Sequence, residues 1–222
     1  MSKHQTQQQN IDTEGLPERF VIVIGRQFGS GGRTIGKIIA DRLGIDYYDT
    51  ELLKKAAESE GIDPMIFKQH EEKKPSVLKM VLQGAYGIAD NFHTLPLSSE
   101  RIYKIQSKVI QDLSDKGSCV IVGRNADFIL RNHPNLLSVF LHSPIQYRVK
   151  RIMERREATS AEEAFDMAMK HDRRRESFYN FYTGEKKWGV AENYHLSLDT
   201  SLLDNESVAD IIIKFAKSKY HL

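Results

Sequence analysis

The chain has 222 residues, of which 40% are hydrophobic and 28% charged, and its formal net charge is +2. This length can bury one sizeable core, with room for a small insertion that acts as a lid. The small net charge argues against a nucleic-acid partner, and no segment reaches the roughly 18 uninterrupted apolar residues that a membrane helix needs.

The N-terminal residues 1–18 are polar and lack the apolar segment of a secretory signal. We expect them to form a flexible tail before a single domain over residues 19–222. Cys119 is the only cysteine, so an internal disulfide is excluded, and with no export signal this favours the cytoplasm. The eight histidines show no metal-ligand spacing, so we predict no metal-binding residues.

Strands and helices are expected to alternate along most of the chain, judged from β-branched runs and from apolar residues at helical spacing. In chain order we predict a strand at 20–24, a helix at 31–43, a strand at 45–48, a helix at 51–59, short helices and loops at 60–97, a helix at 98–116, strands at 119–122 and 136–141, helices at 145–156 and 160–179, a strand at 194–198 and a helix at 207–218. This alternation indicates a parallel sheet with helices on both faces, whose ligands bind beyond the carboxyl ends of the strands.

The first predicted strand ends in the glycine-rich stretch GRQFGSGGRTIG, residues 25–36. Glycines allow positive φ and close approach of a ligand, and the N–H groups that open the next helix favour an anion. A phosphate loop normally carries a lysine where this chain has Gly32, so the charge must come from a neighbour. Arg33 is our candidate, with Arg26 as the second. The alternative is a tight turn whose glycines serve only packing; the strand–helix context favours phosphate binding.

Another predicted strand ends in VIVGRNADFIL, residues 120–130, and places Arg124 at the same edge of the sheet. An arginine there can bind a phosphate through two hydrogen bonds. The alternative is a surface arginine paired with Asp127 or another nearby carboxylate.

Two basic segments follow, residues 142–156 and 170–188. Arg148 and Arg151 are three residues apart and therefore share a helix face. The adjacent arginines Arg173–Arg175 spread over more than half of a helix, so not all of them can reach one site. An ordinary solvated basic face explains these patterns equally well, but their position in a chain with a phosphate loop favours function.

Together these motifs resemble the bacterial cytidylate kinase-like family, relatives of cytidylate kinase among the P-loop nucleoside monophosphate kinases. The resemblance covers nearly everything from residue 20 to 217, through GRQFGSGGRTIGKIIADRLGIDYYD, SCVIVGRNADFIL, VFLHSPIQYRVKRIME, HDRRRESFYNFYTG and WGVAENYHLSLDTS. It implies a three-layer α/β fold of the P-loop kinase type, with a five-stranded parallel sheet and a small helical lid. It also implies transfer of the γ-phosphoryl group of ATP, with Mg²⁺, to a nucleoside monophosphate such as CMP or a related small acceptor.

The resemblance further implies roles for single residues. The ATP phosphates would lie on Gly29, Ser30, Gly31, Gly32, Arg33 and Thr34. The acceptor would contact Asp49, Thr50, Arg124 and Asn125. The catalytic arginines would be Arg33, Arg148, Arg151 and Arg174, of which Arg148 and Arg151 would begin the lid.

The chain departs from true cytidylate kinases at two positions, with Gly32 in place of the lysine and Asn125 in place of an aspartate. Catalysis of phosphoryl transfer is mostly positioning and charge stabilisation, so the loss of these charges bears directly on rate. Two hypotheses follow: an active phosphotransferase in which an arginine replaces the lysine, and a weak or inactive nucleotide-binding module that regulates a partner. The sequence identifies neither the oligomeric state nor such a partner.

Overall fold

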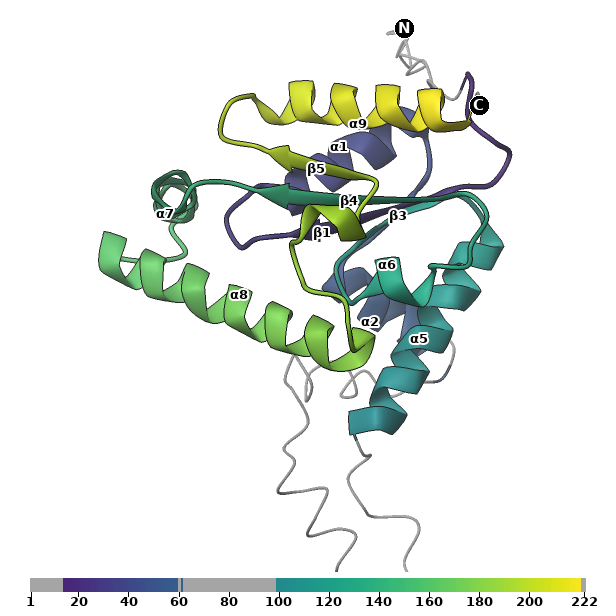
Figure 1. Cartoon of the computed structure of the whole chain (residues 1–222), viewed down its shortest axis with the longest axis horizontal. Coiled ribbons are helices and arrows are strands. Elements are labelled where there is room, and N and C mark those ends of the chain that lie inside the picture. The colour runs from purple at the N-terminus through teal and green to yellow at the C-terminus, as the bar shows by residue number, and fades with distance from the viewer. Residues whose placement is uncertain (1–13, 60, 62–98, 221–222) are drawn as a thin grey trace, which may run out of the picture.

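Five parallel strands form the centre of the computed structural model, which describes residues 14–59, 61 and 99–220 (Figure 1). The elements in chain order are β1 (Val21–Arg26), α1 (Gly32–Leu43), β2 (Asp46–Tyr48), α2 (Thr50–Ser59), α5 (Ser99–Lys116), β3 (Cys119–Val122), α6 (Ala126–Ile129), β4 (Leu136–His142), α7 (Ile145–Glu154), α8 (Ala161–Thr183), the 3₁₀ helix η1 (Ala191–Asn193), β5 (Leu196–Asp199) and α9 (Asn205–Tyr220).

The strand order is β2-β3-β1-β4-β5, so β1 lies in the middle of the sheet. It pairs with a strand on each side, with Val21 opposite both Cys119 of β3 and Leu136 of β4. Because all pairs are parallel, the carboxyl ends of the strands meet at one edge. The strands that follow β1 in sequence are added first on one side of it, as β2 and β3, and then on the other side, as β4 and β5. Open α/β sheets bind their ligands at the point where the strand order reverses in this way.

Helices cover both faces of this sheet: α1 and α9 lie on one face, and α2, α5 and α6 on the other (Figure 1). Side chains of β1 alternate between the two layers. Ile22 and Ile24 pack toward α1 and α9, whereas Val21 and Val23 pack toward the other helices. A strand buried on both faces has to be apolar throughout, which explains the β-branched run in the sequence.

The helix α7 and the first part of α8 pack against each other beyond the carboxyl edge of the sheet, and α8 then runs back below the sheet toward α5 (Figure 1). Their small apolar cluster contains Ile152, Ala164 and Ala168, and Phe28 from the loop after β1 packs against it. The loop is therefore anchored by a hydrophobic side chain between α8 and α7, the helix whose arginines the resemblance placed at the start of a lid.

The predicted fold is confirmed: the protein is a three-layer α/β structure with a five-stranded parallel sheet. Residues 1–13 of the predicted tail and most of the segment 60–97 lie outside the described residues. The sequence analysis missed α6 and η1, which have four and three residues and are too short to show a period. It also ended the long helix at Tyr179, whereas α8 continues to Thr183.

Candidate phosphate-transfer site

The loop between β1 and α1 has the backbone of an anion-binding turn. Gly29 and Gly31 adopt left-handed conformations with φ of 84° and 87°. Gly31 is also the N-cap of α1 and, as a glycine, brings no side chain to the N–H groups of the first turn. Those groups and the helix dipole favour a phosphate at this point.

Close packing adds a second reason for these two glycines. A Cβ at Gly29 would lie 2.9 Å from the Cβ of Arg148, and one at Gly31 would lie 2.7 Å from Nη1 of Arg151. Both arginines come from α7, so this helix lies directly against the loop. At Gly29 both the conformation and the contact with the backbone of α7 favour glycine, whereas at Gly31 the left-handed conformation does so and the end of the Arg151 side chain could move aside.

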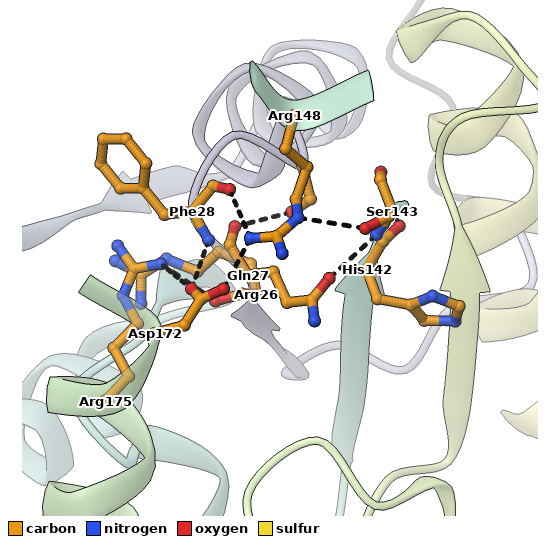
Figure 2. Close-up of polar contacts among 9 residues, drawn as sticks. Arg26, Gln27, Phe28, His142, Ser143, Arg148, Asp172 and Arg175 are labelled. Atoms are coloured by element: carbon orange, nitrogen blue, oxygen red, sulfur yellow. Dashed lines mark hydrogen bonds and ion pairs between the residues drawn. The ribbon is translucent and has the colours of Figure 1, made fainter. Parts of the chain in front are cut away.

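A buried ion pair holds the peptide groups of Phe28 (Figure 2). The Phe28 N–H donates to Oδ1 of Asp172 at 2.7 Å, and Nη1 of Arg148 donates to the Phe28 carbonyl at 3.1 Å. Arg148 and Asp172 are themselves joined at 2.6 Å, and both are less than 9% exposed. Arg148, which the sequence suggested for catalysis, thus acts in this structure as a support of the loop.

Three further segments fix the two ends of the loop. Nη1 of Arg175 donates to the carbonyl of Arg26 at 3.1 Å, on the α8 side. Oε1 of Gln27 accepts from the N–H of Ser143, which follows β4, at 3.0 Å (Figure 2). The buried hydroxyl of Thr200, which follows β5, donates to the carbonyl of Ser30 at 2.8 Å. Contacts of this number and burial preorganise the loop before any ligand arrives.

A pocket of about 320 Å³ opens over the loop. Six arginines and two glutamates form most of its charged lining, an excess of positive charge that suits phosphate groups. The lining residues are Arg26, Gln27, Phe28, Gly29, Gly31, Gly32, Arg33, Thr34, Thr50, Glu51, Arg124, Arg155, Glu157, His171, Arg174 and Arg175.

The turn after β3 brings Arg124 into this pocket through an unusual backbone. Gly123, Arg124 and Asn125 have φ values of 82°, 61° and 55°, three left-handed residues in a row. For a residue with a side chain this conformation costs about 1–3 kcal/mol and persists only where the surroundings enforce it. Arg124 is 4% exposed and still lines the pocket. Strain at this turn supports a functional role for its arginine.

The pocket brings together most of the residues that the sequence suggested. Those that line it are Gly29, Gly31, Gly32, Arg33, Thr34, Thr50, Arg124 and Arg174. Those that are not part of its lining are Ser30, Asp49, Asn125, Arg148 and Arg151.

Residues outside the lining have visible structural roles. Asp49 caps α2, because its Oδ1 accepts from the N–H of Glu51 at 3.0 Å and of Leu52 at 3.2 Å. Nη2 of Arg151 donates to Asn205 at the start of α9 at 3.1 Å. Within the lining, the side chain of Arg33 is 63% exposed, and its Nε lies 3.9 Å from Oδ2 of Asp49.

Sequence reasoning missed the residues that hold the loop from behind. Asp172, Phe28 and Thr200 were not among the candidate residues. Thr200 directly follows a strand, the same signal that pointed to Arg124. No local pattern indicates Asp172, because its partners Phe28 and Arg148 lie 144 and 24 residues away.

The fold and the site define a class, the P-loop kinase fold, here with an arginine-rich pocket over its glycine loop. Within it, the chain belongs to the cytidylate kinase-like family, whose profile matches residues 21–202. A crystal structure of an uncharacterized protein from Eubacterium ventriosum is similar at 29% identity with a TM-score of 0.67, covering 90% of this chain and 99% of that one.

Two shikimate kinases share the fold at lower identity. The enzyme from Acinetobacter baumannii, solved in complex with shikimate, is 14% identical with a TM-score of 0.50 and covers 93% of this chain and 96% of its own. The enzyme from Bacteroides thetaiotaomicron is 13% identical with a TM-score of 0.52, covering 88% and 97%. No curated protein matches the chain significantly. Family and fold together support a phosphotransferase with a nucleotide-binding P-loop.

Within residues 14–59, 61 and 99–220, no helix is long and apolar enough to cross a membrane. The same ranges hold no group of three or more His, Cys, Asp or Glu side chains placed to bind a metal ion.

Proposed function

We propose that the protein transfers the γ-phosphoryl group of ATP to a nucleoside monophosphate of the CMP type or to a related small acceptor. The observation that carries this proposal is the convergence of a glycine phosphate loop and six arginines on one pocket. These arginines come from five places in the fold: the end of β1, α1, the turn after β3, the end of α7, and α8.

The sheet order suggests how the two substrates divide the pocket. ATP phosphates would lie on Gly29–Thr34, at the end of the central strand. Thr50 and Arg124 follow β2 and β3, which are paired neighbours on one side of β1. Both line the pocket, so an acceptor phosphate placed there would face the γ-phosphate of ATP across the end of β1. Arg124 can bind two oxygens of that phosphate at once.

Catalysis in such a site consists of positioning and charge stabilisation rather than covalent chemistry. Arg174 lines the pocket from α8, and its guanidinium can stabilise the negative charge of the phosphoryl group during transfer. Arg148 contributes through the loop that it holds. Arg151, close to Gly31, ties that end of the loop to α9.

Magnesium would enter this site with ATP. Mg²⁺ usually keeps several waters and binds phosphate oxygens plus one or two protein oxygens, so it needs no cluster of protein ligands. Thr34 and Glu51 line the pocket and offer such oxygens. When bound, the ion supplies charge neutralisation between the phosphates.

A panel of nucleoside monophosphates, each supplied with ATP and Mg²⁺ and followed by ADP formation, tests the proposal. We expect turnover above the acceptor-free rate with at least one pyrimidine nucleotide. ATP binding without turnover on any acceptor would favour the alternative function, a nucleotide-binding regulatory module. The absence of a lysine at position 32 is the observation that supports this alternative. Absence of ATP binding would contradict both functions.

A further inference from the structure

Gly32 stands where a phosphate loop normally has its lysine, and the side chain beside it comes from the adjacent strand end. A Cβ built on Gly32 would lie 2.9 Å from Cβ and 2.8 Å from Cγ of Arg26. Gly32 itself has no positive φ and is the first residue of α1, so its backbone would accept alanine. The stem of Arg26, rather than the backbone conformation, therefore requires glycine at position 32.

The other end of the Arg26 side chain meets a second glycine. A Cβ on Gly123, which begins the turn after β3, would lie 2.7 Å from Cζ of Arg26 and would overlap its Nη1. The guanidinium group thus lies against the end of β3. Arg26 is only 7% exposed, and it lines the pocket over the loop. Two glycines accommodate one arginine, the first at its stem and the second at its charged end.

We propose that Arg26 supplies the ATP phosphates with the positive charge that a lysine at position 32 supplies in other phosphate loops. The charge then reaches the loop from the last residue of β1 instead of the first turn of α1. Its stem begins within 3 Å of where a lysine side chain would begin, so the two residues are alternatives for one space. A guanidinium is always charged and can bind two phosphate oxygens at once. This inference rests on the proposed function only in taking ATP as the ligand of the loop.

The backbone of Arg26 is held in place, which limits the positions that its charged side chain can take. Its carbonyl accepts from Nη1 of Arg175, and that guanidinium lies 3.7 Å from the buried carboxylate of Asp172. Arg33, the other arginine close to Gly32, has a side chain that is 63% exposed, with its Nε 3.9 Å from Asp49. Moving an exposed arginine onto a phosphate loses side-chain entropy that a buried one has already lost.

The first experiment measures ATP affinity by calorimetry in variants that lose one charge. Arg26→Gln should weaken ATP binding by about tenfold to a hundredfold, the loss expected for a charge-assisted hydrogen bond. Arg33→Gln should lose less. Lys37→Gln removes an exposed charge from the same helix, outside the pocket lining, and controls for the general field. A loss with Arg33→Gln and none with Arg26→Gln would overturn the inference while leaving ATP binding intact. An absence of ATP binding in the unaltered protein would instead overturn the proposed function.

The second experiment tests the shared space with a double-mutant cycle. Gly32→Ala should displace the Arg26 stem and lower ATP affinity, whereas the same change in an Arg26→Ala background should not. The exchange variant Arg26→Ala with Gly32→Lys should recover part of the affinity that Arg26→Ala loses. Equal effects of Gly32→Ala in both backgrounds, or no recovery in a folded exchange variant, would overturn the inference. Thermal unfolding without nucleotide checks that each variant is folded. If Arg26→Ala does not fold, the ATP affinity of Arg26→Gln alone tests whether the charge of Arg26 contributes to ATP binding.

Discussion

The loop after β1 and the turn after β3 lie side by side at the carboxyl edge of the sheet, because their strands are paired. Their shapes have different origins. The loop is held by residues far away in the chain, such as Asp172, which accepts from Phe28 across 144 residues. The turn is a run of three left-handed residues, Gly123–Asn125, joined to the neighbouring strand by the Gly123 N–H, which donates to the carbonyl of Ile24 at 3.0 Å. Two halves of one pocket are thus held differently, the loop by side chains of α7 and α8 and the turn by the strand beside it.

This difference has a mechanical consequence. Arg148 and Asp172 connect α7 and α8 to Phe28, so we expect the loop to follow any shift of these helices. The Gly123 N–H instead connects the turn after β3 to the carbonyl of Ile24 in β1. We therefore expect the ATP side of the proposed site to follow the helices and the acceptor side to follow the sheet.

The largest expected effect comes from breaking the long-range support. Asp172→Ala removes the carboxylate that pairs with Arg148 and that accepts from the Phe28 N–H, and should lower the free energy of unfolding by about 3–5 kcal/mol. Unfolding in a series of denaturant concentrations measures this change in free energy. Asp166→Ala, at an exposed position of the same helix, is the matched control and should stay within about 0.5 kcal/mol of the unaltered protein. A loss no larger than in this control would show that the ion pair does not hold the loop.

The next effect concerns a carboxyl group just beyond the turn. Oδ2 of Asp127 accepts from the hydroxyl of Tyr179 at 2.9 Å, and burial raises the pKa of Asp127 from 3.8 to about 6. The folded protein therefore binds this proton more tightly than the unfolded chain does. Stability should fall as pH rises from about 4 to about 6 and stay reduced above that range.

Asp127→Asn keeps an oxygen for Tyr179 and removes the titration. The variant should gain up to about 3 kcal/mol over the unaltered protein between pH 4 and pH 7. Unfolding free energies at the two pH values measure this difference. An identical pH dependence in both proteins would mean that Asp127 does not titrate in this range.

The sequence was informative wherever a short pattern sets the structure. The glycines at 29 and 31 and the ends of the strands β1 and β3 are local signals, and they located the pocket. Arg148 shows the limit, because its partner Asp172 lies 24 residues away and only folding brings the two together. The relation between Gly32 and Arg26 is also tertiary. Neighbourhood in sequence singled out Arg33, and both Arg26 and Arg33 line the pocket, so the choice between them stays a prediction. A cytoplasmic location and the absence of a nucleic-acid partner stay predictions.

The smallest effect tests whether the turn after β3 stores strain in its backbone. Arg124 has φ 61°, so replacing it with glycine should give a protein more stable than the alanine variant by about 1–2 kcal/mol. At Lys104, on the exposed side of α5, the order should reverse, because glycine costs a helix about 1 kcal/mol relative to alanine. Both variants at position 124 lack the guanidinium and should raise the acceptor KM or lower kcat alike, with ATP affinity nearly intact. Equal stability of the two would remove backbone strain from the account of this turn. A fall in ATP affinity with unchanged acceptor kinetics would move Arg124 to the ATP side, and the division of the pocket between its two strand ends would have to be redrawn.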